Sequence, residues 1–251
     1  MAYQNTFKRF EFKYLITLEQ KSRILNEMKQ HMALDQYGRT VIRNLYFDTD
    51  NYRLIRHSLE KPVYKEKLRL RSYQAASDHD EVFVELKKKY DHIVYKRRLT
   101  MPQQQALSWL SGNMDLTPSC QIGAEIDYFR KYYSNLHPVV FLSYAREAWY
   151  SLDGSEFRVT FDEEILCRRD RLSLSEEPGG EPILPEGKLL MEIKTIGGIP
   201  LWMTHLLTEN LIYKTSFSKY GTAYQNLIFP ILIQEHKGVF SHDPTAVSRH
   251  I

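Results

Sequence analysis

The sequence predicts an α+β protein: an eight-stranded antiparallel β-barrel with a charged interior and helices packed outside. Three observations lead to this prediction. Segments that alternate apolar and polar residues recur along the 251-residue chain, and the short links between several of them favour antiparallel pairing. The polar faces of these segments carry lysine and arginine with a few glutamates. Amphipathic helical segments also need an apolar surface, which the outside of such a barrel would supply.

The segment Lys61–Tyr73 shows the alternation most clearly. In a β-strand, residues two apart share a face. Four like charges in line repel one another, so their enclosure requires an anion or interleaved carboxylates. Taken alone, the segment also fits an exposed strand with one wet face. The cations that share one face are Lys65, Lys67, Arg69 and Arg71.

The remaining elements are predicted from the periodicity of apolar residues and from residues that typically begin or end helices and turns. Thr17 and Gln20 predict a capping box, Pro102 and Pro200 predict helix starts, and Asp48 is expected to be a structural cap. We expect one domain over residues 1–235 and a loose tail over 236–251. Strands are expected at 7–16, 41–48, 61–73, 81–89, 93–100, 138–150, 156–162 and 189–195, and helices at about 18–32, 103–110, 119–133, 200–213 and 220–234.

Composition limits the classes of function. The 34 basic and 31 acidic residues leave a net charge of +3, so a basic site must come from local arrangement. Cys120 and Cys167 fit neither a metal-ligand spacing nor a disulfide framework, which favours reduced thiols. The N-terminus lacks an apolar signal core, and no apolar run is long enough to span a bilayer. We therefore expect a soluble, cytoplasmic protein without a transmembrane segment.

The polar faces of the predicted strands can point outward or inward. Outward, they would give an ordinary barrel with a charged surface. Exposed strands usually carry threonine, serine, glutamine and mixed-sign charges, so strongly cationic rows favour an inverted barrel that encloses them. Such a tunnel would suit a polyphosphate chain with a divalent metal, because phosphoryl transfer is catalysed mainly by positioning and charge neutralisation. The polar sets are Glu11/Lys13, Lys65/Lys67/Arg69/Arg71, Glu85/Lys87/Lys89, Lys96/Arg98, Tyr144/Arg146, Arg158/Thr160/Asp162 and Glu192/Lys194.

Eight short segments carry a family resemblance between about residues 7 and 222. They are Arg9-Phe-Glu-Phe-Lys-Tyr14, Leu45-Tyr-Phe-Asp-Thr49, Lys67-Leu-Arg-Leu-Arg71, Glu85-Leu-Lys87, Ser143-Tyr-Ala-Arg146, Arg158-Val-Thr-Phe-Asp162, Met191-Glu-Ile-Lys194 and Ser216-Phe-Ser-Lys-Tyr220. As an ordered set, they resemble the catalytic domain of the vacuolar transporter chaperone (VTC) polyphosphate polymerases, within the triphosphate tunnel metalloenzyme superfamily.

The resemblance implies an activity, a cofactor and a set of site residues. The activity would be transfer of the γ-phosphate of ATP onto a growing inorganic polyphosphate chain, with Mn²⁺ or Mg²⁺ as cofactor. The resemblance places Glu192 as the metal ligand, with Glu11 and Glu85 as further candidates. The catalytic contacts with phosphate fall to Arg69, Arg71, Lys87 and Arg158. Other phosphate-binding positions are Lys13, Lys67, Lys96, Tyr144, Arg146, Lys194, Ser218 and Lys219.

Two positions depart from the pattern of related proteins. The hydrolytic branch of the superfamily begins with two glutamates and a lysine, each two apart, and Arg9 stands at the first of these places. One fewer carboxylate favours the polymerase branch. Ser216 stands where polymerases can carry a lysine, which puts one phosphate contact in doubt.

Three other functions stay open at this point. A tri- or polyphosphate hydrolase would use Glu11 and Glu85 with Glu192 to hold metal. A binding module would hold polyanions without turnover, and an RNA-binding domain is a weaker alternative. Nucleic acid is not expected as a partner, because glutamates share the cationic rows and most strand tyrosines fall on the apolar side. The expected partners are ATP and inorganic polyphosphate, and no membrane partner is inferred.

Overall fold

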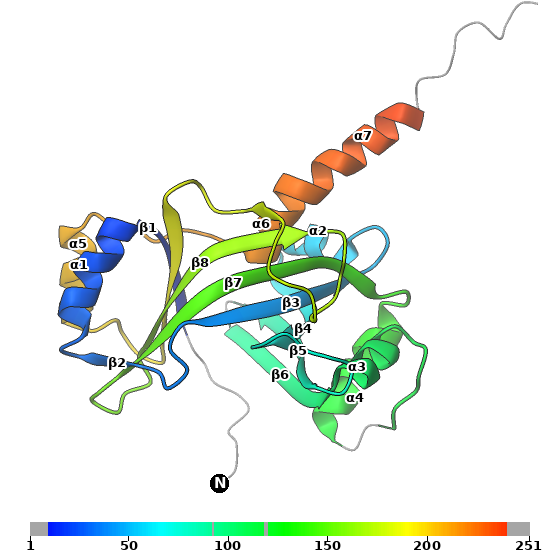
Figure 1. Cartoon of the computed structure of the whole chain (residues 1–251), viewed down its shortest axis with the longest axis horizontal. Helices are drawn as coiled ribbons and strands as arrows, with labels where there is room; N and C mark the ends of the chain where they lie inside the picture. Colours follow the sequence, from blue (N-terminus) through cyan, green and yellow to red (C-terminus); the bar gives the residue numbers. More distant parts are fainter. Residues whose placement is uncertain (1–9, 92, 118–119, 240–251) are drawn as a thin grey trace, which may run out of the picture.

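The computed structural model describes residues 10–91, 93–117 and 120–239, and a strongly curled antiparallel sheet dominates it (Figure 1). The strands lie in the order β1-β10-β8-β7-β3-β4-β5-β6. These eight strands are the predicted ones, which confirms the α+β fold class. Their bounds are β1 Phe10–Thr17, β3 Thr40–Asp48, β4 Tyr64–Ser72, β5 Glu81–Tyr90, β6 Ile93–Pro102, β7 His137–Ser151, β8 Arg158–Arg168 and β10 Lys188–Thr195.

The sequence-based prediction missed two short strands and part of a long one. Strand β2, Met32–Leu34, pairs with β7, and β9, Glu181–Pro182, pairs with β8. Strand β8 continues well past the predicted end at residue 162. Glu164 has a φ of 51°, and the β7–β8 register shifts nearby, so a bulge interrupts the alternation that marks the strand in the sequence.

Helices form three groups around the sheet (Figure 1). Two groups cover its outer face, and the third closes part of the concave side, where Tyr220 stacks on Tyr46 and Lys219 contacts Glu192. Helices α1, Leu18–Met28, and α5, Leu201–Glu209, pack with β1, β8 and β10. Helices α3, Gln103–Leu110, and α4, Gln121–Tyr132, pack with β4 and β5. Helices α2, Arg53–Leu59, and α6, Lys219–Ala223, pack with β3 and β7 together with a π-helical turn, Tyr224–Ile228.

The last helix, α7, Phe229–Val239, projects away from the sheet (Figure 1). The prediction that the final helix packs against the body is wrong for this part, because Phe229 is 48% exposed and Ile233 is 40% exposed. Residues 240–251 of the predicted tail lie outside the described residues. None of the helices described between residues 10 and 239 is long and apolar enough to cross a membrane.

The apolar face of the sheet points toward the helices and the charged face points inward. Leu68 and Leu70 are fully buried in the cluster that contains Trp109 of α3 and Phe129 of α4. On the opposite face of the same strand, the Arg71 guanidinium donates to the Tyr144 hydroxyl of β7 at 3.1 Å. Strands β4 and β7 are not neighbours in the sheet, so side chains reach across its concave side. The inverted arrangement is confirmed.

The backbone hydrogen bonds do not close the sheet into a complete barrel. Strands β1 and β6 end the strand order and do not pair with each other within the described residues. The free edge of β1 is instead partly covered by the segment before α6, where the Thr215 amide donates to the Lys13 carbonyl at 2.7 Å. The two sides of the seam also meet through Glu11 and Lys87, whose charged groups lie 3.4 Å apart.

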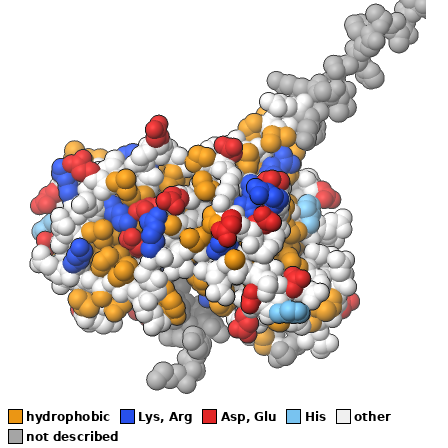
Figure 2. All heavy atoms as spheres, viewed as in Figure 1, with side chains coloured by type: hydrophobic (Ala, Val, Ile, Leu, Met, Phe, Trp, Pro, Cys, Tyr) orange, Lys and Arg blue, Asp and Glu red, His pale blue; other side chains and the backbone are white. Residues whose placement is uncertain are grey.

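The outer surface differs from this interior in its charge pattern. On the face shown in Figure 2, basic and acidic side chains lie side by side among hydrophobic ones. An exposed pair of this kind is Arg23 and Glu19 of α1, whose charged groups lie 2.6 Å apart. Such neutralised pairs have no surplus of either sign.

Two caps fix the elements that border the tunnel. The Thr17 hydroxyl accepts from the Gln20 amide at 3.1 Å while the Gln20 side chain accepts from the Thr17 amide at 2.9 Å, which confirms the predicted capping box. The fully buried Asp48 carboxylate accepts from the amides of Leu54 and Ile55, at 2.9 and 3.0 Å. It also accepts from the Tyr220 hydroxyl at 2.8 Å. Asp48 therefore joins β3, α2 and α6.

We predict that Asp48→Ala lowers the free energy of unfolding by about 3 kcal/mol, because two buried helix amides and a buried phenol lose their acceptor. Urea denaturation measures this change. Asp50→Ala is the matched control, since Asp50 is 81% exposed, and its effect should stay below about 0.5 kcal/mol. Equal stability of the two variants would show that Asp48 does not hold these elements together.

Candidate functional site

The first charged cluster of the tunnel is centred on Glu85 of β5, which is 1% exposed. Arg69 of β4 donates to one carboxylate oxygen at 2.7 Å, and Lys96 of β6 contacts the other at 2.6 Å. Arg98, opposite Glu85 in the β5–β6 register, donates through Nε at 2.8 Å. Burial raises the pKa of Glu85, but Arg69 and Arg71 outweigh it, so the pKa lies well below its usual range. Glu85 is therefore an ionised carboxylate held by cations.

The second cluster is centred on Asp162 of β8 and Glu192 of β10. Arg146 of β7 donates to both oxygens of Asp162, at 2.5 and 2.6 Å. Lys219, at the start of α6, lies 2.5 Å from Asp162 and 3.1 Å from Glu192. Lys194 lies 3.2 Å from Glu192. Burial raises the pKa of Glu192, but Lys219 and Lys194 outweigh it and hold the pKa well below the usual range. Both carboxylates are thus fixed anions within a basic lining.

Tyr144 lies between the two clusters. Its hydroxyl accepts from Arg71, and the Lys219 ammonium lies 4.7 Å from the centre of its ring. Burial raises the pKa of Tyr144, but Arg71, Arg146 and Lys219 together hold it below its ordinary value. The phenol is consequently polarised by the same cations that would surround a bound anion.

Lys67 has no carboxylate partner among the described residues. Its ammonium group donates to the Ser218 hydroxyl at 2.8 Å. In the register, Lys67 faces Lys87, which in turn faces Lys96, and like charges directly opposite one another are destabilising. Burial first, and then Lys87 and Lys13, lower the pKa of Lys67 to about 7. This part of the tunnel is therefore suited to an anionic ligand.

The structure brings nearly all the predicted site residues to the concave face. Arg158, the first residue of β8, pairs in register with Lys194 and shares the face of Asp162, but it is exposed and makes no ion pair within the described part of the chain. Ser216 is exposed, and Arg9 lies outside the described residues. The residues that contact one another in the tunnel are Glu11, Lys13, Lys67, Arg69, Arg71, Glu85, Lys87, Lys96, Tyr144, Arg146, Glu192, Lys194, Ser218 and Lys219.

Several residues of the tunnel were absent from the predicted site, among them the charged residues Asp162 and Arg98. Asp162 is fully buried and is the main partner of Arg146, and Arg98 is a partner of Glu85. Arg98 lies two residues after Lys96, and Asp162 lies four residues after Arg158. Because an even spacing along a strand keeps side chains on one face, the alternation alone placed both on the charged face. What the sequence did not indicate was the cross-strand partner of each.

The donor set can be tested against the metal that the family resemblance implies. Within the described residues, no three His, Cys, Asp or Glu side chains lie close enough to hold an ion by themselves. Opposite Glu192 in the register, however, the buried Thr160 hydroxyl has no hydrogen-bond partner there. Hard divalent ions take oxygen ligands and, in the case of Mg²⁺, share their coordination with water and substrate phosphate. Glu192 and Thr160 therefore fit an ion that is held jointly with a phosphate substrate.

Comparison with known proteins agrees with this geometry. A family model described as "VTC domain" matches residues 8–228. No curated protein sequence matches the chain. A solved structure of a "putative adenylate cyclase" from Bacillus halodurans is similar with a TM-score of 0.54 and 17% identity, over 90% of this chain and 100% of that one. A second "putative adenylate cyclase", from Vibrio parahaemolyticus, has a TM-score of 0.50 and 12% identity, over 86% and 98% of the chains. At these identities the two structures support the fold alone.

We predict that tripolyphosphate binds more tightly as the pH falls toward about 7, the value to which burial and neighbouring lysines lower the pKa of Lys67. Above that pH, Lys67 is largely neutral in the free protein, so binding must also take up a proton. Lys67→Arg keeps its charge and should show a flatter dependence between about pH 6 and about pH 9. Calorimetric titration of both proteins checks this, and identical pH profiles would contradict it.

Proposed function

The chain belongs to the VTC domain family, and from this premise we propose that it is a metal-dependent phosphotransferase that extends inorganic polyphosphate with the γ-phosphate of ATP. One observation carries the proposal: the concave face gathers many more cations than carboxylates, and the carboxylates are already paired with those cations. A surplus of fixed positive charge in a partly enclosed space binds and orients a phosphate chain.

The proposed roles follow from the positions of the side chains. Arg69, Arg71 and Lys87 line one side of the tunnel and would hold the γ-phosphate while charge develops on it. Arg146 and Lys219 line the other side and would hold the acceptor chain. The other predicted phosphate ligands extend this surface. Arg158 would contact the chain where it leaves the tunnel, because this residue is exposed at the start of β8.

The metal, Mn²⁺ or Mg²⁺, would be held by Glu192 with oxygens from the substrate. When bound, it would neutralise charge on the phosphates. The Lys194 contact with Glu192 would have to yield, since one carboxylate oxygen must turn from the ammonium group to the ion.

Hydrolysis is the main alternative and needs more carboxylates at the metal. Glu85 is enclosed by Arg69, Lys96 and Arg98, and Glu11 contacts Lys87 at 3.4 Å. Lys87 is the largest influence on Glu11 and, against burial, lowers the pKa of its carboxyl. Glu192 is also held by cations, among them Lys194 and Lys219. Hydrolysis would therefore require three carboxylates to release their cations together, whereas the proposed transfer requires only one to do so, which supports transfer over hydrolysis.

Incubation with ATP, Mn²⁺ and a short polyphosphate primer tests the proposal directly. We expect a ladder of longer chains on a gel, with ADP released in step. Shortening of the primer, or release of free phosphate alone, would identify a hydrolase. A bound primer with no change in length and no consumption of ATP would identify a binding module and contradict catalysis.

We predict that Glu192→Gln and Arg69→Ala each lower the rate of chain growth by about 100-fold or more, since each removes a charge that would act on the transferring phosphate. Arg23→Ala is the control, because Arg23 is exposed on α1 in a surface ion pair with Glu19. Thermal unfolding must show that the variants remain folded. Normal turnover by either tunnel variant would refute the assignment.

A further inference from the structure

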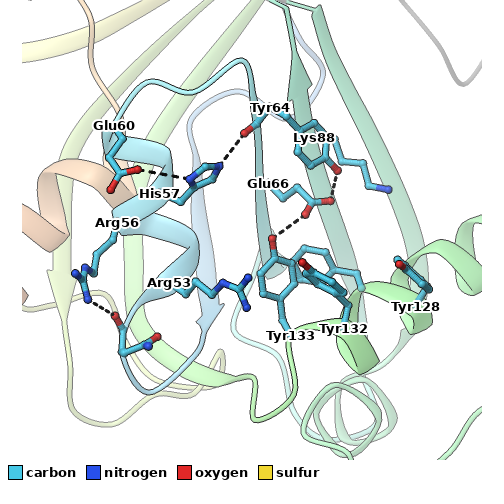
Figure 3. A pocket seen from close by; sticks show the side chains of 12 residues that line it. Arg53, Arg56, His57, Glu60, Tyr64, Glu66, Lys88, Tyr128, Tyr132 and Tyr133 are labelled. Atoms are coloured by element: carbon cyan, nitrogen blue, oxygen red, sulfur yellow. Dashed lines mark hydrogen bonds and ion pairs between the residues drawn. The ribbon is translucent and has the colours of Figure 1, made fainter.

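A separate cavity of about 780 Å³ lies on the outer side of the sheet (Figure 3). Its walls are α2, the start of β4 and the end of α4. Tyr64 and Glu66 of β4 line it, and they alternate with Lys65 and Lys67, which belong to the inner face of the same strand. The cavity and the tunnel are therefore back to back and share no lining side chain.

The aromatic wall of this cavity is held in place by Glu66. The Tyr133 hydroxyl donates to one oxygen of Glu66 at 3.2 Å, and the Tyr64 hydroxyl donates to the other (Figure 3). Burial first, and then Glu66, raise the pKa of Tyr133 to about 12, so this phenol remains a donor. The ring of Tyr132 stands edge-on to Tyr133, at 4.8 Å between centroids, and stacks with Tyr128 at 6.2 Å.

The outermost rings of this wall are open to a ligand. Tyr128 is 70% exposed and Tyr132 is 56% exposed, although both are in contact with aromatic neighbours. Large aromatic faces that are positioned yet exposed are suited to stacking against another planar ring.

Two arginines of α2 line this cavity and have no carboxylate partner within the described residues, and Arg53 is the one that lies against the aromatic wall (Figure 3). The Arg53 guanidinium lies over the rings of Tyr132 and Tyr133, at 5.7 and 5.3 Å. Arg56 makes only a long contact, 3.5 Å, with the carbonyl of Asn51. Other cations of the cavity differ, because Lys88 and His57 each have an acidic neighbour. The planar donor forks of the two arginines match the geometry of a phosphate group.

We propose that this cavity binds a nucleoside phosphate, with its base against Tyr128 and Tyr132 and its phosphate on Arg53 and Arg56. The volume falls in the range of small-molecule sites. Base stacking and phosphate contacts are both required, so a phosphate without a base and a nucleoside without a phosphate bind more weakly. This site is additional to the tunnel and does not depend on the proposed transfer reaction.

Binding of ADP to the full chain tests the site, with saturating tripolyphosphate present to fill the tunnel. We expect ADP to bind at least about tenfold more tightly than adenosine or pyrophosphate. Tyr132→Ala and Arg56→Gln should each weaken ADP binding by about tenfold or more, while leaving tripolyphosphate binding unchanged. Both residues are exposed, and thermal unfolding confirms that the variants are folded. Tyr150→Ala is the control, since Tyr150 is a 46% exposed tyrosine of β7 outside the cavity.

Three outcomes would overturn the proposal. Loss of all ADP binding when tripolyphosphate is present would mean that ADP binds only in the tunnel. Equal affinity for ADP and pyrophosphate would mean that the base is not recognised. Unchanged ADP affinity in both cavity variants would place the site elsewhere.

Discussion

The tunnel depends on three buried carboxylates, Glu85, Asp162 and Glu192, each held by cations from more than one secondary-structure element. Arginine and lysine side chains in a confined space repel one another, and these anions allow them to be packed together. The carboxylates depend equally on the cations, because removing one partner of a buried ion pair destabilises the fold by about 3–5 kcal/mol. The ion pairs across β4–β5–β6 and across β7–β8–β10 therefore join neighbouring strands on the charged face and fix the positions of its charged groups. The compensation is partial, and the remaining positive charge is what a phosphate chain would neutralise.

Much of this arrangement could be predicted from the sequence because it follows from local periodicity. The alternation of Lys67, Arg69 and Arg71 with leucines identified both faces of β4, and the helices that need an apolar surface indicated which face is inside. Other features depend on contacts between distant residues. The pairing of Asp162 with Arg146 and the bulge at Glu164 leave no local signal. The exposure of Phe229 on α7 is equally invisible in a sequence that is apolar on most sides.

Strand β4 connects the two sites proposed for this protein. Its odd-numbered residues from Lys65 to Arg71 face the tunnel, while Tyr64 and Glu66 face the outer cavity. Helix α2 contacts both sides, since the Ser58 carbonyl accepts from the Lys65 ammonium at 3.2 Å and Arg53 lines the cavity. A single strand and one short helix thus separate a surface for phosphate chains from a cavity with aromatic walls.

The central claim is that the tunnel holds positive charge in need of an anion, and thermal unfolding with and without tripolyphosphate tests it most directly. Tripolyphosphate should raise the unfolding temperature of the native protein, because a ligand that binds only the folded state stabilises it. The shift should be lost when Lys67 and Lys87 are both changed to methionine. It should persist when the exposed Lys29 and Lys188 are changed instead, which removes the same charge outside the tunnel. No shift in the native protein, or an equal shift in the tunnel variant, would contradict the account.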